Sequence, residues 1–252
     1  MLVEPAGPLN VGSVARLCAN FGISQLRLVA PRCDHLGEEA RRMAVHGGAL
    51  LEHARLYGDL AQALADCRRV VATSGRIEPE AQPLASAAEA LAWLKAGAGQ
   101  AGATAALVFG REDRGLSNDE LRQAGRVVRL STAAAYSSLN LSHAVAICLH
   151  ELQRLEESPP SAPAAPAAQP AADDAPAHPD GAEPSPRAAL EAALSDAEGL
   201  LLEVGFLYPH TAHARMAKLR GLLQRAQVTD QEVALLRGMV RQLRWAAQRR
   251  TP

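Results

Sequence analysis

One stretch of the 252-residue chain, residues 158–186, is too rich in proline to form part of a packed core. It holds nine prolines, four acidic residues and many alanines, and it has no lysine, arginine, leucine, isoleucine, valine or aromatic residue. Such a segment cannot bury apolar surface, so we expect a semi-extended, disordered linker. The chain therefore divides into a main domain of residues 1–157, this linker, and a C-terminal extension of residues 187–252.

The main domain alternates short apolar runs with helical patterns. Runs of strand length occur at residues 26–30, 70–73, 105–109 and 127–130, and helical patterns at 12–21, 59–66, 86–96, 117–124 and, most strongly, 138–156. Strands of this length separated by helices predict an α/β domain with a parallel sheet. The first strand can draw only on residues 1–4, so it is either short or completed by residues upstream of this start.

The extension is predicted to be all-α and basic. Helical patterns cover residues 187–204, 212–226 and 230–248, and Thr229 with Glu232 forms a capping box for the last of them. Ten Lys and Arg residues stand against six acids, whereas the main domain is nearly neutral. On the last helix Arg237, Arg241 and Arg244 recur on one face without paired acids. This concentration of charge favours a polyanion-binding surface, and a merely solvated helical face stays open as the alternative.

The composition of the chain narrows the classes of molecule that the protein can bind. Aromatic residues make up only 3% of the chain, which argues against a single-strand binder built on stacking platforms, and the net charge of −1 argues against a wholly basic nucleic-acid coat. No apolar run approaches the roughly 18 residues that span a bilayer, and residues 1–5 do not resemble a signal peptide. We therefore expect a cytoplasmic protein with no membrane partner.

Several common kinds of site are disfavoured. The four cysteines, at positions 18, 33, 67 and 148, include no C-x-x-C pair, so we interpret them as reduced thiols, mostly in the core. The histidines show no metal-ligand spacing, and we expect no metal. Neither a P-loop lysine, a dinucleotide fingerprint nor a G-x-S-x-G elbow is present, which disfavours nucleotide hydrolysis, oxidoreduction and serine-hydrolase chemistry.

Three polar segments remain, each beside a predicted strand end or helix start: residues 10–16, 109–116 and 136–142. We expect Asn10 just before the first helix and Arg16 about one turn inside it, on the exposed side. The glycines of the middle segment permit close approach of a ligand. Ligands of open parallel sheets bind at strand ends, so these segments are candidates for one site. Taken singly, each has a structural alternative, as a helix cap, a turn glycine or a solvated acid.

Together, and in this order, the segments resemble the motifs of the SpoU-like RNA 2′-O-methyltransferases of the SPOUT superfamily. The matching runs are N-V-G-S-V-A-R (10–16), L-V-F-G-R-E-D-R-G-L-S-N-D-E-L (107–121) and Y-S-S-L-N-L-S-H-A-V (136–145). The run V-A-T-S-G-R (71–76) and the tail run K-L-R-G-L-L-Q-R-A (218–226) further resemble the TrmJ subfamily of bacterial tRNA methyltransferases. The sequence departs from the family pattern at Ala133–Ala135, where we expect a more polar stretch.

This resemblance implies a fold and an activity. The main domain would be a SPOUT domain with a C-terminal trefoil knot, acting as a homodimer. S-adenosylmethionine would bind in the knot, and its methyl group would pass to the ribose 2′-hydroxyl of cytidine or uridine 32 in the anticodon loop of tRNA. No metal is required, because the sulfonium is the electrophile. The alternatives are an rRNA 2′-O-methyltransferase of the same class and a catalytically inactive RNA-binding module.

The resemblance also assigns residues. The cofactor residues would be Thr73, Ser74, Gly75, Gly110, Leu130, Ser137, Ser138 and Leu139. The catalytic or substrate-side residues would be Asn10, Arg16, Glu112, Ser138 and Asn140. The RNA-binding residues would be Arg16, Arg111, Arg114, Arg215, Lys218, Arg237 and Arg241. A guanidinium is a poor base, so we expect Arg16 to orient a phosphate and stabilise the developing alkoxide, with the proton passing to phosphate, to Glu112 or to water.

Overall fold

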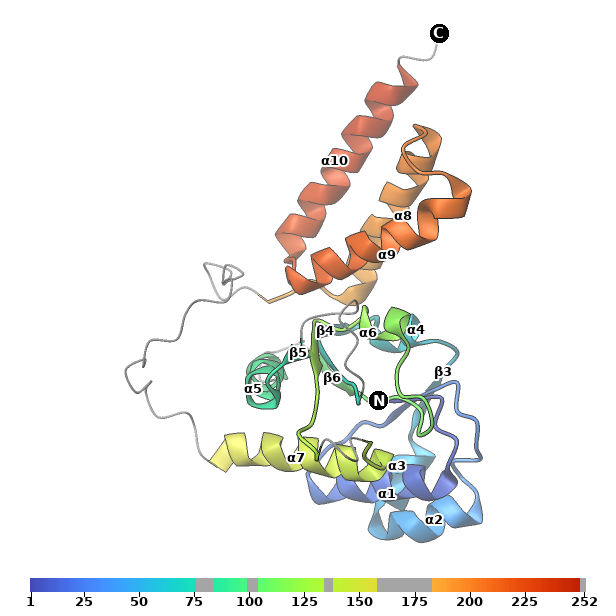
Figure 1. The fold of residues 1–252 in the computed structure, drawn as a ribbon, viewed down its shortest axis with the longest axis vertical. Coiled ribbons are helices and arrows are strands. Elements are labelled where there is room, and N and C mark those ends of the chain that lie inside the picture. The colour runs from blue at the N-terminus through green and yellow to red at the C-terminus, as the bar shows by residue number, and fades with distance from the viewer. Residues whose placement is uncertain (76–83, 99–103, 134–137, 158–182, 250–252) are drawn as a thin grey trace, which may run out of the picture.

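A computed structural model of the chain describes residues 1–75, 84–98, 104–133, 138–157 and 183–249. Figure 1 shows an α/β domain with a helical extension standing on one end of it. The disordered linker expected at 158–186 lies outside the described residues as far as residue 182, as does Ser137. In the parts that the structure describes, no helix is long and apolar enough to cross a membrane.

The described residues include seven short strands in two hydrogen-bonded groups, and every strand pair is parallel. Their bounds are β1 Leu2–Val3, β2 Arg27–Val29, β3 Arg55–Tyr57, β4 Cys67–Thr73, β5 Leu84–Ala85, β6 Thr104–Val108 and β7 Arg126–Val128. The hydrogen-bonded orders are β1-β2-β3 and β5-β7-β4-β6. A parallel bridge between Leu2 and Phe109 joins the two groups of strands, so the expected parallel α/β architecture is confirmed.

Helices cover the sheet. They are α1 Pro8–Asn20, α2 Glu38–Ala44, α3 Gly48–Glu52, α4 Leu60–Leu64, α5 Ala87–Ala98, α6 Asn118–Leu121 and α7 Leu141–Glu157, with a 3₁₀ turn at Val45–Gly47. Helices α1 and α7 pack side by side against β1 and β2 through an apolar cluster that includes Val14 and Val145. Gly12 allows the close approach of α2, because a Cβ there would lie 2.2 Å from the Ala40 carbonyl oxygen.

The predicted helix boundaries were wrong at two places that matter for the site. Helix α1 begins at Pro8, a residue suited to the first helical position, so Asn10 lies in the first turn rather than before it. Helix α7 begins at Leu141 rather than at residue 138, because the Asn140 side chain accepts a hydrogen bond from Ser142 N–H in the manner of a cap. Ser138 and Leu139 therefore lie in the preceding loop.

The extension is a three-helix bundle with its own core. Its helices are α8 Arg187–Glu203, α9 Pro209–Arg225 and α10 Asp230–Gln248. The core gathers eight buried residues: Leu190, Ala193, Leu194, Leu207, Ala212, Met216, Val228 and Val233. The capping box of Thr229 and Glu232 is confirmed, with both of its hydrogen bonds formed.

The extension docks where β4 begins. Arg69 on β4 forms an ion pair with Glu183, and both side chains are nearly buried. Trp93 Nε1 on α5 donates to Gln227 Oε1 at 3.1 Å, and Ala188 N–H donates to the Ala65 carbonyl at 3.0 Å. Residues 183–186, expected in the linker, therefore lie against the main domain. Because β4 has seven residues, this junction is about 20 Å from the other end of the strand.

The cysteines are free thiols, as the sequence predicted. Cys18, Cys67 and Cys148 are buried and Cys33 is partly buried. Burial raises the pKa of the Cys67 and Cys148 thiols to about 12, so both stay protonated and act as small apolar core residues.

Candidate active site

A cavity of about 270 Å³ lies where β4, β6 and β7 end and the loops after them begin. Seven of the eight residues that the resemblance assigns to the cofactor line it: Thr73, Ser74, Gly75, Gly110, Leu130, Ser138 and Leu139. The strand ends are held in register, since Ser74 N–H donates to the Val128 carbonyl at 2.9 Å. The fold thus gathers four separate stretches of sequence around one small cavity.

A chain of hydrogen bonds joins the three polar motifs beside this cavity. Asn140 Nδ2 donates to Asn10 Oδ1 at 3.0 Å, and Asn10 Nδ2 donates to Glu112 Oε1 at 3.1 Å. Asn140 is oriented in turn by Ser142, whose backbone N–H and hydroxyl both donate to Asn140 Oδ1 at 2.8 Å. Helix α1, the loop after β6 and the start of α7 are therefore tied together by side chains from all three motifs.

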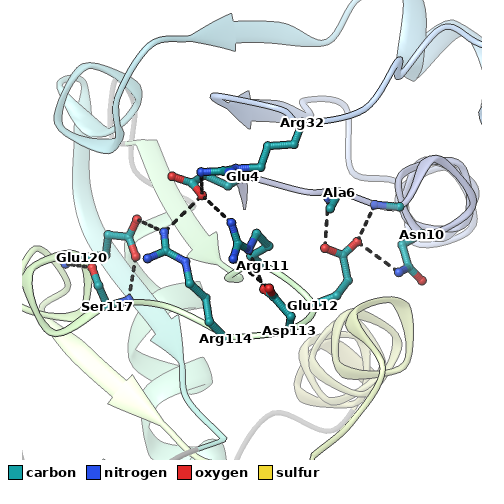
Figure 2. Close-up of polar contacts among 11 residues, drawn as sticks. Glu4, Ala6, Asn10, Arg32, Arg111, Glu112, Asp113, Arg114, Ser117 and Glu120 are labelled. Atoms are coloured by element: carbon teal, nitrogen blue, oxygen red, sulfur yellow. Dashed lines mark hydrogen bonds and ion pairs between the residues drawn. The ribbon is translucent and has the colours of Figure 1, made fainter.

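Glu112 is fixed by the backbone as well. Its carboxylate accepts hydrogen bonds from Ala6 N–H at 3.0 Å and Gly7 N–H at 3.1 Å (Figure 2). Partial burial alone would raise the pKa of Glu112, but these bonds and that from Asn10 together outweigh it and lower the pKa below its usual range. A carboxylate held by three donors is a poor proton acceptor. The geometry thus favours Glu112 as the group that positions Asn10 and disfavours it as the base.

The loop that carries Glu112 is braced by a cluster of charges. Glu4 accepts from Arg32 at 2.8 Å, Arg111 at 3.3 Å and Arg114 at 3.2 Å (Figure 2). Arg111 also pairs with Asp113 at 2.5 Å. The resemblance assigned Arg111 and Arg114 to RNA binding, whereas here carboxylates of the main domain already balance their charges. Both arginines therefore hold the wall of the cavity in this structure.

A second, more open cavity of about 650 Å³ adjoins the first. Glu112, Ser138 and Leu139 line both cavities, and Asn140 and His143 line only the outer one. Sequence reasoning missed His143 as a site residue. Its spacing could have revealed it, because His143 lies three residues after Asn140 and one helical turn brings such residues to the same side.

Of the assigned catalytic residues, Asn10 and Arg16 line neither cavity. Asn10 is nevertheless tied to the site by its hydrogen bonds with Glu112 and Asn140, whereas Arg16 is not. Arg16 is exposed on α1, as predicted, and its side chain forms no hydrogen bond or ion pair with the described residues. Arg16 is six residues after Asn10, about 9 Å along the helix and on a different side of it. Leu9, seven residues before Arg16, shares its side of the helix and is also exposed.

The extension's cations are less free than the sequence suggested. The expectation that α10 presents a basic face without paired acids was wrong for two of its three arginines, because α8 supplies acids to Arg237 and Arg244 but none to Arg241. Arg244 lies 3.8 Å from Glu203 and Arg237 lies 3.9 Å from Asp196. Within the described part of the chain, Arg215, Lys218 and Arg241 have no carboxylate within 4 Å and are exposed.

No group of three or more His, Cys, Asp or Glu side chains among the described residues is placed to hold a metal ion. The candidate site brings amide, carboxylate, hydroxyl, guanidinium and imidazole groups around two adjoining cavities.

Comparison with known proteins agrees with this arrangement. The model of the SpoU rRNA Methylase family matches residues 1–150, and that of the tRNA methyltransferase TrmJ, C-terminal domain, matches residues 188–252. The chain is 34% identical over 247 residues to the tRNA (cytidine/uridine-2′-O-)-methyltransferase TrmJ of Klebsiella pneumoniae, covering 95% of this chain and 93% of the relative. It is 36% identical over 161 residues to the tRNA (cytidine-2′-O-)-methyltransferase TrmJ of Methanocaldococcus jannaschii, covering 60% and 65%.

A solved structure is similar over the whole chain. The crystal structure of TrmJ from Z. mobilis ZM4 superposes with a TM-score of 0.77 at 29% identity, and the match covers 96% of both chains. Since both parts of the sequence and the complete fold match, the chain belongs to the SpoU methylase family and, within it, to the TrmJ group.

Proposed function

We propose that the protein transfers a methyl group from S-adenosylmethionine to the ribose 2′-hydroxyl of cytidine or uridine 32 in the anticodon loop of tRNA. The hydrogen-bond chain Asn140–Asn10–Glu112 carries this proposal, because it assembles the three motifs of the family at the edge of a cavity. The names of the relatives support tRNA as the substrate and a pyrimidine 2′-oxygen as the acceptor. Position 32 and the cytoplasmic location rest on the family resemblance.

The size and lining of the inner cavity support this cofactor. A volume of about 270 Å³ lies just below the roughly 300–1,000 Å³ of small-molecule sites. Backbone groups at Thr73–Gly75 and Gly110 would face the ligand, and Gly110 admits no side chain, since a Cβ there would lie 2.2 Å from the Gly115 carbonyl carbon. When bound, the sulfonium supplies an activated methyl group. We expect the surrounding chain to thread through a trefoil knot, as the resemblance implies.

The outer cavity would take the acceptor nucleoside. Asn140 and Ser138 lie at its junction with the inner cavity, where a ribose hydroxyl would meet the methyl group. Holding the two reactants in line supplies much of the rate gain in such a displacement. As the 2′-oxygen forms its new bond to carbon, its proton leaves through the open outer cavity to water or to the substrate's phosphate. Glu112 keeps Asn10 and Asn140 in place throughout.

Arg16 is assigned to the substrate side. An exposed guanidinium without a carboxylate partner is suited to bind a phosphate and to stabilise the developing alkoxide. In a homodimer, which the resemblance implies, the exposed side of α1 that carries Leu9 and Arg16 would face the second copy or the RNA bound to it. Analytical ultracentrifugation tests the dimer, and a monomeric wild-type protein would refute it.

The extension would increase the affinity of the protein for tRNA. Arg215, Lys218 and Arg241 lie on exposed helix surface and can contact phosphates irrespective of sequence. Truncation after about residue 160 should therefore retain cofactor binding and lose most affinity for tRNA. Equal tRNA affinity of the truncated and full-length proteins would refute this role.

Labelled methyl transfer to unmodified tRNA and to rRNA, followed by nuclease digestion and nucleoside mass analysis, tests the function. Label on the 2′-oxygen of an anticodon-loop pyrimidine supports the proposal. Label confined to rRNA would point to the same-class alternative, and RNA binding without cofactor binding would point to the inactive module.

A further inference from the structure

The described surface exposes three aromatic side chains, and all three lie in the extension. Phe206 is 62% exposed, Tyr208 56% and Trp245 53%, whereas the other described aromatic residues are at least partly buried. Exposure of large rings costs stability in the free protein and usually marks a surface that contacts something else. The low aromatic content of the sequence did not reveal this, because composition does not show that the exposed rings lie together in the extension.

These rings gather at the end of the extension remote from the main domain. Helices α8 and α10 both start at the junction, where Ala188 and Asp230 contact the main domain, and both run away from it (Figure 1). With 17 and 19 residues they extend about 25–28 Å. Their far ends meet, since Arg244, next to Trp245, lies 3.8 Å from Glu203, and the turn with Phe206 and Tyr208 follows directly.

Each ring has a cationic or imidazole neighbour. The Arg249 guanidinium lies 3.9 Å from the Trp245 ring centroid, and that of Arg215 lies 6.0 Å from the Phe206 centroid. The His210 ring stacks on Tyr208 with centroids 5.9 Å apart and planes at 22°. Among the described residues, neither Arg215 nor Arg249 has a carboxylate within 4 Å, so their charges remain available.

This combination is the chemistry that binds unpaired nucleotides. A nucleobase stacks on an aromatic face whatever its sequence, and an adjacent guanidinium can take up the phosphate beside it. A ring already covered on one side by a guanidinium can still accept a base on its other side, and the cation strengthens the stack. A protein-docking surface would not need the guanidinium groups that lie beside Phe206 and Trp245.

We infer that Phe206, Tyr208 and Trp245 form a base-stacking surface for unpaired nucleotides of the substrate RNA. The inference rests on the proposed function, because it takes tRNA as the RNA bound. The surface lies tens of ångströms beyond the junction, and the junction is itself about 20 Å from Thr73 at the cofactor cavity. The surface therefore binds unpaired nucleotides far from the cofactor cavity of the same chain. These nucleotides are distinct from the one that receives the methyl group.

The test uses the full-length protein and two fluorescent RNA probes, a single-stranded oligouridylate and a duplex of equal length. Replacing Phe206, Tyr208 or Trp245 by Leu keeps the apolar bulk and removes the aromatic face. We expect each change to weaken oligouridylate binding by about 5-fold or more, with no change in the slope of log K against log salt. Duplex binding should be unaffected by these changes.

Two sets of control variants make the result specific. Lys218→Gln and Arg241→Gln should instead lower the salt slope by about one each, because they remove phosphate contacts. Leu235→Ala removes an exposed apolar side chain from the same helix as Trp245 and should leave RNA affinity unchanged. Circular dichroism and cofactor titration would verify that every variant is folded.

Aromatic variants that bind oligouridylate as well as the wild type would overturn the inference. So would aromatic variants that keep RNA affinity but lose self-association in the ultracentrifuge, since the surface would then be a protein interface. A different result would refute the proposed function alone. If RNA binding depends on the aromatic residues but the wild type transfers no methyl group to tRNA, the stacking surface is supported and the assigned activity is refuted.

Discussion

The substitution Gly110→Ala tests the geometry of the cofactor cavity. The added Cβ would lie 2.2 Å from the Gly115 carbonyl carbon and 2.3 Å from Leu116 N. An ordinary contact needs about 3.4 Å, so the backbone must move by more than an ångström. The loop is closed by a 2.8 Å hydrogen bond from Gly115 N–H to the Arg111 carbonyl, and it lines the cavity, so this movement cannot leave the site intact.

Overpacking a rigid site costs about 1–3 kcal/mol, and a clash with backbone belongs at the upper end. At about 3 kcal/mol the melting temperature should fall by roughly 6–12 °C, given 2–4 °C per kcal/mol for a chain of this size. Affinity for S-adenosylmethionine should fall at least about tenfold, since the wall of the cavity is displaced. Differential scanning fluorimetry and isothermal titration calorimetry measure the two effects.

Gly115→Ala is the matched control in the same loop. Its φ of +69° carries a strain of about 1–2 kcal/mol for alanine, but nothing lies within 4 Å of the added Cβ. It should therefore lower the melting temperature less than Gly110→Ala does. A Gly110→Ala protein that melts within a degree of the wild type and binds the cofactor equally would refute the reasoning.

Four further predictions follow from particular contacts. Because folding lowers the pKa of Glu112, its carboxylate stabilises the fold above the unfolded-state pKa, and this contribution is lost as the pH falls through the folded-state pKa. Glu112→Gln should therefore lower the free energy of unfolding at neutral pH. Urea titrations should show that its difference from the wild type disappears in acid. Glu183→Gln leaves Arg69 nearly buried without its counter-charge and should weaken docking by about 2–3 kcal/mol, seen as faster hydrogen exchange at the start of α8; unchanged exchange would contradict this. Gly238→Ala, at an open position inside α10, should stabilise the extension by up to about 1 kcal/mol, and a lower melting temperature would count against that geometry. Arg16→Lys should reduce methyl transfer by about 100-fold or more with cofactor affinity unchanged, whereas near-normal turnover would exclude a bidentate guanidinium role.

Local chemistry explains which elements could be predicted. Helix α10 carries its own capping box and its apolar spacing, and the four longer apolar runs became strands β2, β4, β6 and β7. The edge strand β3, Arg55–Tyr57, has only three residues and is mostly exposed, so it leaves no periodic signal. Helix α2, Glu38–Ala44, is polar on most of its surface and is specified by packing against α1, which a local pattern does not contain.

The candidate site, too, could be predicted from the sequence only in part. The residue types of the three motifs and their order along the chain were visible in the sequence, and the resemblance placed them around a cofactor. The Asn140–Asn10–Glu112 chain was not visible, because it joins residues brought together only by the fold. The bracing role of Glu4 and the pairing of Arg244 with Glu203 were missed for the same reason. In each case a charge counted as free along the sequence is balanced by a carboxylate from a distant element.

Single-turnover methyl transfer to unmodified tRNA, comparing the wild type with Asn140→Ala, tests the central claim most directly. The claim is that the three motifs form one site for ribose 2′-O-methylation, held together by Asn140. It predicts label on the 2′-oxygen of pyrimidine 32 with the wild type, and in the variant a rate lower by about 100-fold or more with cofactor binding retained. Label on a nucleobase, or an Asn140→Ala protein that transfers methyl groups at the wild-type rate, would contradict it.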